Sequence, residues 1–366
     1  MGPELTVLAP GLLGPWPAAQ CRFVCEGLQL PSFSLLFARG SVAGAGGGDD
    51  SLSGALCEAF GLRAGASGWP VAALTRLVDG AHEAGGRAFL RADPVHLEAQ
   101  PHGAQVVYGE ALRLSREEAV ALAGELAELP APGPPQALAA YRWYVPMDDS
   151  GGRGCGEVGA VTTHPLDVAV TRVRGSLLPG GDGGGPWRAW LTQAQMILHR
   201  APLNERRVSD GLPAVNSLWL WGGGALPPRR QASYARALGA DPLLIGLCRH
   251  HGLAHECWDG GWPAAADALA RGGNTLLLWT GACSLARRGD VESWREALQR
   301  FEVQLARPVV GALRDAKLRA MRLLMPPAPA LRVTRGQLWR WWRRKHWLHY
   351  TGLEAWGERA LSARVS

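Results

Sequence analysis

The sequence predicts an α/β protein, with a mostly parallel sheet whose two faces are covered by helices. Two observations lead to this class. Short apolar runs that suit buried strands alternate with longer stretches that carry apolar residues at helical spacing. This alternation begins at the N-terminus and resumes in the second half of the chain, after a middle part of different texture. Parallel strands need crossover connections, and helical crossovers cover both faces of the sheet.

Length and composition are those of a globular protein. The chain has 366 residues, of which 47% are hydrophobic and 19% charged, enough for one large domain or for a core with a smaller partner. No apolar run is long enough to span a bilayer, and the N-terminus lacks the features of a signal peptide. The seven cysteines show no repeated CxxC spacing and fit reduced thiols. We therefore expect a cytoplasmic protein.

The first part of the core is expected over residues 1–84. Leu5–Ala9 is an apolar run ended by a Pro-Gly pair, and it predicts the first core strand. Gly40–Asp50 is rich in glycine and predicts a loop. Ser51–Phe60 and Pro70–Ala84 carry apolar residues at helical spacing and predict two helices.

Residues 85–174 predict a small α+β subdomain inserted into the core. Ser115 and Glu118 can satisfy each other's amides as a capping box, which opens a helix that runs to about Leu129. Gly180–Gly185 is the expected return loop. Strands are predicted over Arg87–Leu97, Gln105–Leu114, Tyr141–Met147 and Val168–Val173.

Residues 175–330 resume the alternation and complete the core. Helices are predicted up to His199, near Arg229–Leu238, and over Leu243–His251, Pro263–Arg271 and Val291–Arg314. Strands are predicted over Val215–Trp221, near His255, and over Asn274–Trp279 and Arg319–Met325.

Residues 331–366 form a basic, tryptophan-rich C-terminal segment. Its part from 331 to 347 has six basic residues and no acidic one, and the rest of the chain has 32 of each, so the net charge of +6 comes from this segment. Such mixtures bind RNA or membrane surfaces in other proteins. Because the remainder is neutral, we instead predict a helix that docks Trp339 and Trp342 on the core. We expect no membrane contact, and no nucleic acid as a partner.

A candidate ligand site lies between Gln195 and Gly224. Val215–Trp221 predicts a buried strand, and the three glycines after it leave open space at its carboxyl end, where open α/β sheets bind ligands. Donors just upstream suit an anionic group. The alternative is a helix, a polar turn and a core strand whose tryptophans pack. The residues predicted to bind the ligand are His199, Asn204, Arg207, Asn216, Trp221, Gly222 and Gly224.

Two further clusters carry polar groups of the kinds found in ligand and metal sites. Arg91, Asp93 and His96 lie at near-alternate positions of a predicted strand and could hold a phosphate or carboxylate; the alternative is an Arg–Asp pair on a solvated edge. Cys248–Cys257 contains cysteines and histidines, but it lacks the paired spacing of closed zinc sites, and we predict no metal there.

These stretches together resemble the bacterial RpfE-type regulatory proteins, which are phosphoglycerate-mutase-like, over nearly the whole chain. More distantly, the layout is similar to the archaeal type of cofactor-independent phosphoglycerate mutase in the alkaline phosphatase superfamily. That likeness implies an alkaline-phosphatase-like α/β core with an inserted domain, two divalent metals such as Mn, and a Ser or Thr nucleophile, here Ser51 or Ser53. The most specific matching stretches are Leu8–Leu13, Arg91–Leu97, Gln195–His199 and Asn216–Gly224.

The chain departs from the enzyme pattern at three strand ends. Pro10-Gly11 stands in place of a metal-binding Asp after the first strand. After a later strand, Cys283 or Ser284 and Arg287 or Arg288 stand in place of an Asp and a His, and Met325–Pro327 replaces the last Asp-His. A two-metal site needs several carboxylates and imidazoles. The resemblance with these departures therefore implies loss of metal-dependent phosphoryl transfer.

The sequence accordingly predicts a non-catalytic regulatory protein without a resident cofactor. Its expected ligand is a small phosphorylated or carboxylated metabolite, and Arg287 and Arg288 would add anion-binding groups in the vacated site. A regulatory protein partner would fit this role. Two alternatives remain open: an active mutase or phosphohydrolase with a rearranged metal site, and a nucleic-acid-binding protein that uses the C-terminal segment.

Overall fold

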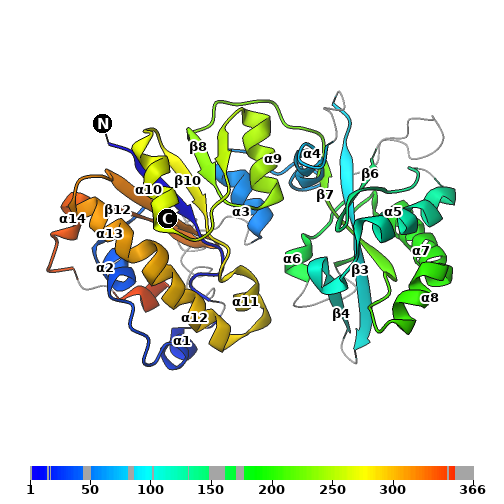
Figure 1. The fold of residues 1–366 in the computed structure, drawn as a ribbon, viewed down its shortest axis with the longest axis horizontal. Coiled ribbons are helices and arrows are strands. Elements are labelled where there is room, and N and C mark those ends of the chain that lie inside the picture. The colour runs from blue at the N-terminus through cyan, green and yellow to red at the C-terminus, as the bar shows by residue number, and fades with distance from the viewer. Residues whose placement is uncertain are drawn as a thin grey trace. The chain divides into compact units, whose positions relative to one another are not determined.

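The chain folds into two compact units, one made of residues 1–61 and 230–366 and the other of residues 62–229. The second unit is thus contiguous and extends beyond the interval 85–174 expected for an insertion. Both units are drawn in Figure 1, where the second runs from blue at α4 (Val71–Arg76) through cyan to green. This computed structural model describes residues 2–14, 16, 18–43, 51–80, 86–100, 103–130, 132–147, 161–169, 177–343 and 346–350.

A seven-stranded sheet forms the centre of the first unit. Strand β1 (Glu4–Leu8) lies between β10 (Thr275–Leu278) and β11 (Ala320–Met325), and both pairings are parallel. Strands β8 (Arg236–Leu238) and β9 (Ala254–Glu256) continue the parallel part beyond β10. On the other side, β12 (Ala328–Thr334) and β2 (Ser41–Val42) add two antiparallel strands. The predicted mostly parallel sheet is confirmed.

Helices cover this sheet, as the apolar spacing predicted. The largest buried cluster joins Leu5 and Val7 of β1 to side chains of several helices, among them Phe33, Trp294 and Val309. These helices are α2 (Pro31–Arg39), α10 (Trp262–Ala270), α11 (Cys283–Arg288), α12 (Val291–Phe301) and α13 (Arg307–Arg314). The remaining helices of the unit are α1 (Ala18–Val24), α3 (Leu52–Ala59), α9 (Pro242–His251) and α14 (Arg335–Leu338).

A π-helical turn, Glu302–Ala306, joins α12 to α13. Its first residue, Glu302, is only 2% exposed although it carries a carboxylate. The two carboxylate oxygens accept the backbone N–H groups of Ser32 (3.0 Å) and Phe33 (2.7 Å) at the start of α2. A buried carboxylate is stabilised by such donors and by the positive end of the helix dipole. Glu302 therefore fixes α2 against the long helix.

The second unit is built on an antiparallel sheet. Its central strand is β3 (Phe89–Gln100), which pairs with β7 (Ser217–Gly224) on one side. On the other side β3 pairs with β6 (Arg142–Pro146) near its start and with β4 (Gly103–Tyr108) near its end. Strand β5 (Gln136–Ala139) extends the sheet beyond β6.

Helices of the second unit cover this sheet around a core of its own. Trp143, Trp187 and Trp190 are its largest buried side chains, and they pack with leucines of the helices and strands. The predicted capping box is confirmed, because Ser115 and Glu118 exchange both hydrogen bonds at the start of α5. The helices are α4 (Val71–Arg76), α5 (Arg116–Glu125), α6 (Leu166–Ala169), α7 (Gly184–Arg200) and α8 (Pro202–Ser209).

Several element predictions were wrong. The strand expected from Val215 exists, but as β7 it lies antiparallel in the second unit and not in the parallel sheet. No helix forms near Arg229–Leu238, where two prolines precede the strand β8. Val168 and Ala169 belong to the helix α6 and not to a strand, and residues 170–173 lie outside the described residues.

Two elements are shorter than expected. Strand β4 ends at Tyr108 and is followed by a 3₁₀ turn, whereas a strand to Leu114 was predicted. Helix α4 ends at Arg76, whereas a helix to Ala84 was predicted, and residues 81–84 lie outside the described residues.

The prediction that Trp339 and Trp342 dock on the core was also wrong. These side chains and Trp341 are 73%, 64% and 71% exposed, respectively. The chain from 331 first continues the strand β12, which sets a different direction for the residues that follow. Trp347 and Tyr350 pack on the core instead. The Trp347 ring centre lies 5.2 Å from that of Phe33, and the Tyr350 ring centre lies 5.3 Å from that of Phe37.

Within the residues that the structure describes, no helix has the length and apolarity to cross a bilayer.

Candidate functional site

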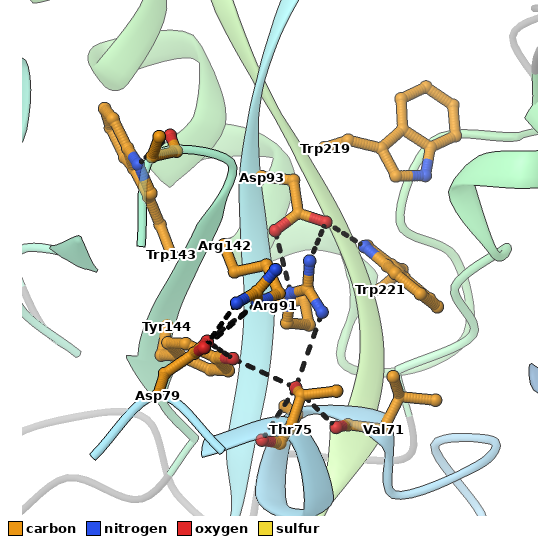
Figure 2. Close-up of polar contacts among 12 residues, drawn as sticks. Val71, Thr75, Asp79, Arg91, Asp93, Arg142, Trp143, Tyr144, Trp219 and Trp221 are labelled. Carbon is orange, nitrogen blue, oxygen red and sulfur yellow. Dashed lines mark hydrogen bonds and ion pairs between the residues drawn. The ribbon is translucent and has the colours of Figure 1, made fainter. Parts of the chain in front are cut away.

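A network of charged and polar side chains surrounds Tyr144 in the second unit (Figure 2). It joins residues of α4, β3 and β6, and the Tyr144 ring at its centre is fully buried. We call it the arginine cluster. Its members are Arg76, Arg87, Arg91 and Arg142, with Asp79 and Asp93 as their counter-charges and Thr75, Tyr144 and Trp221 as further partners.

Arg91 and Asp93 form a buried, bidentate ion pair at the inner end of the cluster. The Arg91 Nε and Nη2 groups donate to the two carboxylate oxygens of Asp93 at 2.8 Å and 2.7 Å. The two residues are 6% and 2% exposed, so the expected alternative of a solvated edge does not apply. Trp221 Nε1 donates to Asp93 Oδ2 at 2.7 Å, and its ring centre lies 5.1 Å from the Arg91 guanidinium carbon.

Burial raises the pKa of Asp93, while the Arg91 charge and the donated hydrogen bonds act in the opposite direction. Both oxygens of Asp93 accept N–H donors, two of them from the Arg91 cation, and this arrangement favours the ionised carboxylate. We therefore describe Asp93 as ionised in the intact pair. Arg91, Asp93 and Trp221, which were predicted as parts of one or another ligand site, are thus brought together by the pairing of β3 with β7.

A second ion pair lies beside the Tyr144 hydroxyl. Arg142 donates to Asp79 through Nε (2.8 Å) and Nη2 (2.5 Å). The Tyr144 hydroxyl lies 2.5 Å from Asp79 Oδ2 and 3.0 Å from Thr75 Oγ1. The hydrogen bond with Asp79 raises the pKa of Arg142, and burial raises the pKa of Tyr144. Both groups therefore keep their protons at neutral pH.

Arg76 and Arg87 add positive charge at the partly exposed side of the cluster. The Arg76 guanidinium lies over the Phe89 ring at 3.8 Å and donates to the neutral Gln136 side chain at 3.0 Å. Arg87 lies 5.8 Å from the same ring. Burial lowers the pKa of Arg76 and is the largest effect on it; Arg87 lowers this pKa further, whereas Tyr144 and Asp79 raise it.

The cluster can therefore attract an anion. Among the described residues, the guanidinium groups of Arg76, Arg91 and Arg142 gather around the carboxylates of Asp79 and Asp93, and Arg76, Arg87 and Arg142 are partly exposed. Planar guanidinium groups match phosphate and carboxylate oxygens in a bidentate manner. Sequence reasoning found only the buried end of this cluster, because Arg76, Asp79 and Arg142 lie in other elements. The alternation of Arg142 and Tyr144 in an otherwise apolar strand was the available signal.

Four other predicted site residues hold the chain that leads into β7. Asn204 Nδ2 donates to the carbonyls of Leu198 (2.8 Å) and Val215 (2.9 Å), and its Oδ1 accepts from Val215 N–H. Asn216 bonds both the N–H and the carbonyl of Leu97. His96 Nδ1 lies 2.8 Å from the carbonyl of Ala214.

Arg207 is the fourth, and it is 1% exposed. Its Nη1 lies 2.8 Å from the Glu118 carboxylate oxygens, and its other nitrogens donate to the carbonyls of Leu112 and Pro213. These contacts use the polar atoms that were expected to face a ligand. His199, by contrast, is exposed on α7. A ligand role for these residues stays a prediction.

The space expected after the strand at Gly222 and Gly224 is filled by α4. A Cβ atom at Gly222 would lie 2.8 Å from the Val71 Cβ, and one at Gly224 would lie 3.1 Å from the Pro70 Cβ. Their φ angles of 67° and 150° also favour glycine. The prediction of an open corner was wrong, because the glycines serve the close approach of β7 to the start of α4.

The candidate nucleophiles lie at the start of α3. Ser51 is fully buried and its Oγ accepts the Gly54 N–H at 2.9 Å, as an N-cap does. Ser53 Oγ lies 3.2 Å from Ser51 Oγ. The predicted anion ligands Arg287 and Arg288 lie in α11, where Arg288 is exposed and the Arg287 side chain lies outside the described residues.

The residues that directly follow β1, β10 and β11 in the first unit carry neither carboxylate nor imidazole. After β1 the chain turns through Pro10 and Gly11, whose carbonyl accepts the Trp294 indole N–H at 3.0 Å. Trp279 follows β10, and the cis-linked Pro326-Pro327 follows β11. Nowhere in the described part of the chain do three or more His, Cys, Asp or Glu side chains gather as metal ligands would. A two-metal site needs several carboxylates and imidazoles, and the residues described at these three strand ends supply none.

Comparison with known proteins places this chain near one class of enzymes. It is 29% identical over 186 residues to the 2,3-bisphosphoglycerate-independent phosphoglycerate mutase of Methanothrix thermoacetophila, which covers 46% of this chain and 47% of that protein. It is 24% identical over 190 residues to a probable enzyme of the same name from Geobacter sulfurreducens, with 47% and 46% covered. The chain spans about half the length of these curated relatives.

Among solved structures, the PH0037 protein from Pyrococcus horikoshii has a similar fold. It matches with a TM-score of 0.56 and 14% identity, over 90% of this chain and 86% of that one. No family model matches the chain. The protein thus has the expected α/β fold, with a mostly parallel sheet covered by helices, and about half of the chain is similar in sequence to 2,3-bisphosphoglycerate-independent phosphoglycerate mutases.

Proposed function

We propose that this protein is a non-catalytic, metal-free relative of the phosphoglycerate mutases that binds a small phosphorylated or carboxylated metabolite. A regulatory role of the RpfE type would follow from such binding. The observation that carries the proposal is the set of residues at the carboxyl ends of β1, β10 and β11. Pro10, Trp279 and Pro326 supply neither carboxylate nor imidazole at positions where a two-metal reaction needs them.

The position of the two serines supports the same proposal. A nucleophile must reach the phosphorus atom of its substrate, but Ser51 is fully buried and Ser53 is 5% exposed. The Ser51 hydroxyl is already committed to the first turn of α3. A serine whose hydroxyl accepts a backbone N–H of the first turn is a common N-cap, so Ser51 needs no catalytic role to explain its position.

The arginine cluster is the region that we propose for anion binding. Arg76, Arg87 and Arg142 would contact the oxygens of the ligand, and the buried Arg91–Asp93 pair would hold Tyr144 and Trp221 in place behind them. Losing one charge-assisted hydrogen bond costs about 1.5–3 kcal/mol, or roughly ten- to a hundredfold in affinity.

Catalysis is tested with the purified full chain, supplied with Mn²⁺, Mg²⁺ or Zn²⁺ in turn. We expect no stoichiometric metal by elemental analysis and no interconversion of 2- and 3-phosphoglycerate. About two bound metal ions per chain, together with metal-dependent turnover that Ser51→Ala abolishes, would instead establish the active mutase with a rearranged metal site.

Binding is tested by calorimetry with 3-phosphoglycerate and inorganic phosphate as probes. We expect Arg76→Gln and Arg87→Gln to weaken binding by roughly tenfold or more, because each removes one guanidinium group from the cluster. Arg314→Gln, an exposed arginine at the end of α13, is the matched control and should bind as the unmodified protein does. Equal affinity in all three variants would remove the cluster from consideration.

A further inference from the structure

A cavity of about 500 Å³ opens in the first unit where β8 and β10 end. These two strands are parallel neighbours, and ligands of α/β proteins bind at the carboxyl ends of such strands. Its volume lies in the range of small-molecule sites. The polar side chains that line it are Asp241, Asp259, Thr280, Arg300 and Gln304, and the aromatic ones are Trp258 and Trp279.

Glycines at the turns after the strands shape this cavity. Gly239 follows β8 and has a φ angle of 150°, and a Cβ there would lie 2.8 Å from Leu244. Gly260 has a φ angle of 95°, and the Gln304 amide lies where its side chain would start. At Gly281 a Cβ would lie 2.6 Å from the Trp279 ring. Any side chain at these three glycines would meet the neighbouring residues, so the backbone of these turns packs closely on the residues that form the cavity wall.

The two tryptophans of the lining are fixed in orientation. Trp258 Nε1 donates to the carbonyl of Gly261 at 2.8 Å, which anchors the polar edge of the indole. Trp279 packs edge to face on Phe301 with ring centres 5.0 Å apart. Fixed aromatic surface offers apolar contact to the C–H groups of a ligand without loss of side-chain entropy.

The charges of the lining do not favour an anion. Two carboxylates and one guanidinium line the cavity, and Arg300 also lies 3.7 Å from the Glu296 carboxylate. The Asp241 carboxylate caps α9 by accepting the Leu243 and Leu244 N–H groups, and Asp259 Oδ1 accepts the Gly261 N–H. What remains is a rim of mixed donors and acceptors next to aromatic carbon. That mixture suits hydroxyl groups, which both donate and accept.

We propose that this cavity binds a neutral, polyhydroxylated small molecule of one or two sugar rings. Its C–H faces would pack on the partly exposed Trp258 ring beside the edge of Trp279, and its hydroxyls would bond Asp259, Arg300 and Gln304. This site is independent of the arginine cluster, which belongs to the other unit. Either site can therefore fail without affecting the case for the other.

The proposal is tested on the full chain by saturation-transfer NMR and calorimetry. The probes are neutral hexoses, pentoses, disaccharides and their reduced polyols at up to about 10 mM, a concentration that detects millimolar binding. The corresponding sugar phosphates, sugar acids and amino sugars are tested in parallel. We expect binding of at least one neutral compound. No neutral binder, or binding of charged compounds alone, would overturn the proposal.

Variants locate the binding. Thr280→Phe fills the cavity from an exposed position, and Asp259→Asn removes a charge with little change of shape. We expect each variant to weaken binding by about tenfold or more. Thr280→Phe does so by occupying the space of the ligand, and Asp259→Asn by loss of a hydrogen bond to a charged group. Asp267→Asn on α10 and Arg314→Met on α13 are matched exposed controls that should bind as the unmodified protein. Neutral binding that Thr280→Phe leaves unchanged would place the ligand elsewhere.

Discussion

The buried Arg91–Asp93 pair is held by several contacts at once. Removing two charges from water costs several kcal/mol each, and mutual attraction repays that cost only when the remaining polar atoms are also bonded. Here the Trp221 indole N–H donates a further hydrogen bond to the Asp93 carboxylate, and the Tyr144 and Trp221 rings lie close to the Arg91 guanidinium. Each residue thus depends on the other to remain buried.

Substituting Arg91 alone should therefore destabilise the protein strongly. For Arg91→Met we expect a loss of about 3–5 kcal/mol in the free energy of unfolding, because Asp93 is left buried and unpaired. Burial then raises the Asp93 pKa without an opposing cation, so the loss should grow as pH rises from about 4 to 7. Urea denaturation at several pH values measures both effects. A loss under about 1 kcal/mol would show that the pair is not buried as described.

The cysteines offer a second prediction at this scale. Burial raises the pKa of Cys25 and Cys248 to about 12 each, whereas Cys257 is exposed. Only the thiolate reacts with alkylating reagents, and raised pKa values leave little of it at pH 8. We expect iodoacetamide to modify Cys257 well before Cys25 or Cys248 in the folded protein, as followed by peptide mass spectrometry. Equal rates in the native state, and not only in urea, would contradict this order.

Single residues of the site were predictable only where one strand carries them. Arg91 and Asp93 are two positions apart on β3, so their common face follows from strand geometry. Asp79 and Arg142 meet across 63 positions, and no local spacing connects them. Polar atoms that bond the backbone, as in Asn204, have the same residue types as ligand-binding ones, so sequence alone could not tell these roles apart.

Elements with strong local signals were predicted well. The capping box at Ser115 and the long amphipathic stretch Val291–Arg314 both form as expected, since their signals lie within one element. The π-helical turn at Glu302 was not predicted, because its carboxylate serves α2, some 270 positions away. The strand β7 was predicted but assigned to the wrong sheet, since a buried apolar run looks the same in both.

The C-terminal segment gives a test at the scale of elements. Trp347 is 3% exposed and packs on Phe33, whereas Trp341 is 71% exposed. We expect Trp347→Ala to cost about 3–5 kcal/mol of stability and Trp341→Ala less than about 0.5 kcal/mol. Chemical denaturation of the two variants decides the matter. Similar losses in both, or a larger loss for Trp341→Ala, would mean that the segment docks differently.

The whole molecule consists of two units, each with a core of its own. An insertion was predictable from the change of texture near residue 85, but its bounds were not. The unit runs from 62 to 229 because β7 pairs with β3 and α4 packs on β7, and both contacts are long-range. Sequence patterns report local periodicity and carry little information on which segments pair.

The division predicts that residues 62–229 fold when expressed alone. Their antiparallel sheet and the cluster around Trp143 and Trp190 are contained within this interval. We expect native-like dispersion in NMR spectra and a single cooperative thermal transition. A chain that lacks near-ultraviolet circular dichroism and unfolds without cooperativity would show that the first unit is required.

Strand β1 is made long before its two neighbours in the sheet, β10 and β11. Its parallel partner β11 begins at Ala320, so a ribosome that adds roughly 5–20 residues per second reaches it about 15–60 s after β1. The second unit, in contrast, is complete once residue 229 has emerged. During synthesis the apolar strand Leu5–Leu8 therefore has neither parallel neighbour until β10 emerges, and one of its edges stays unpaired until β11 follows. Chaperone binding to nascent chains should concentrate in that interval and end when β11 emerges.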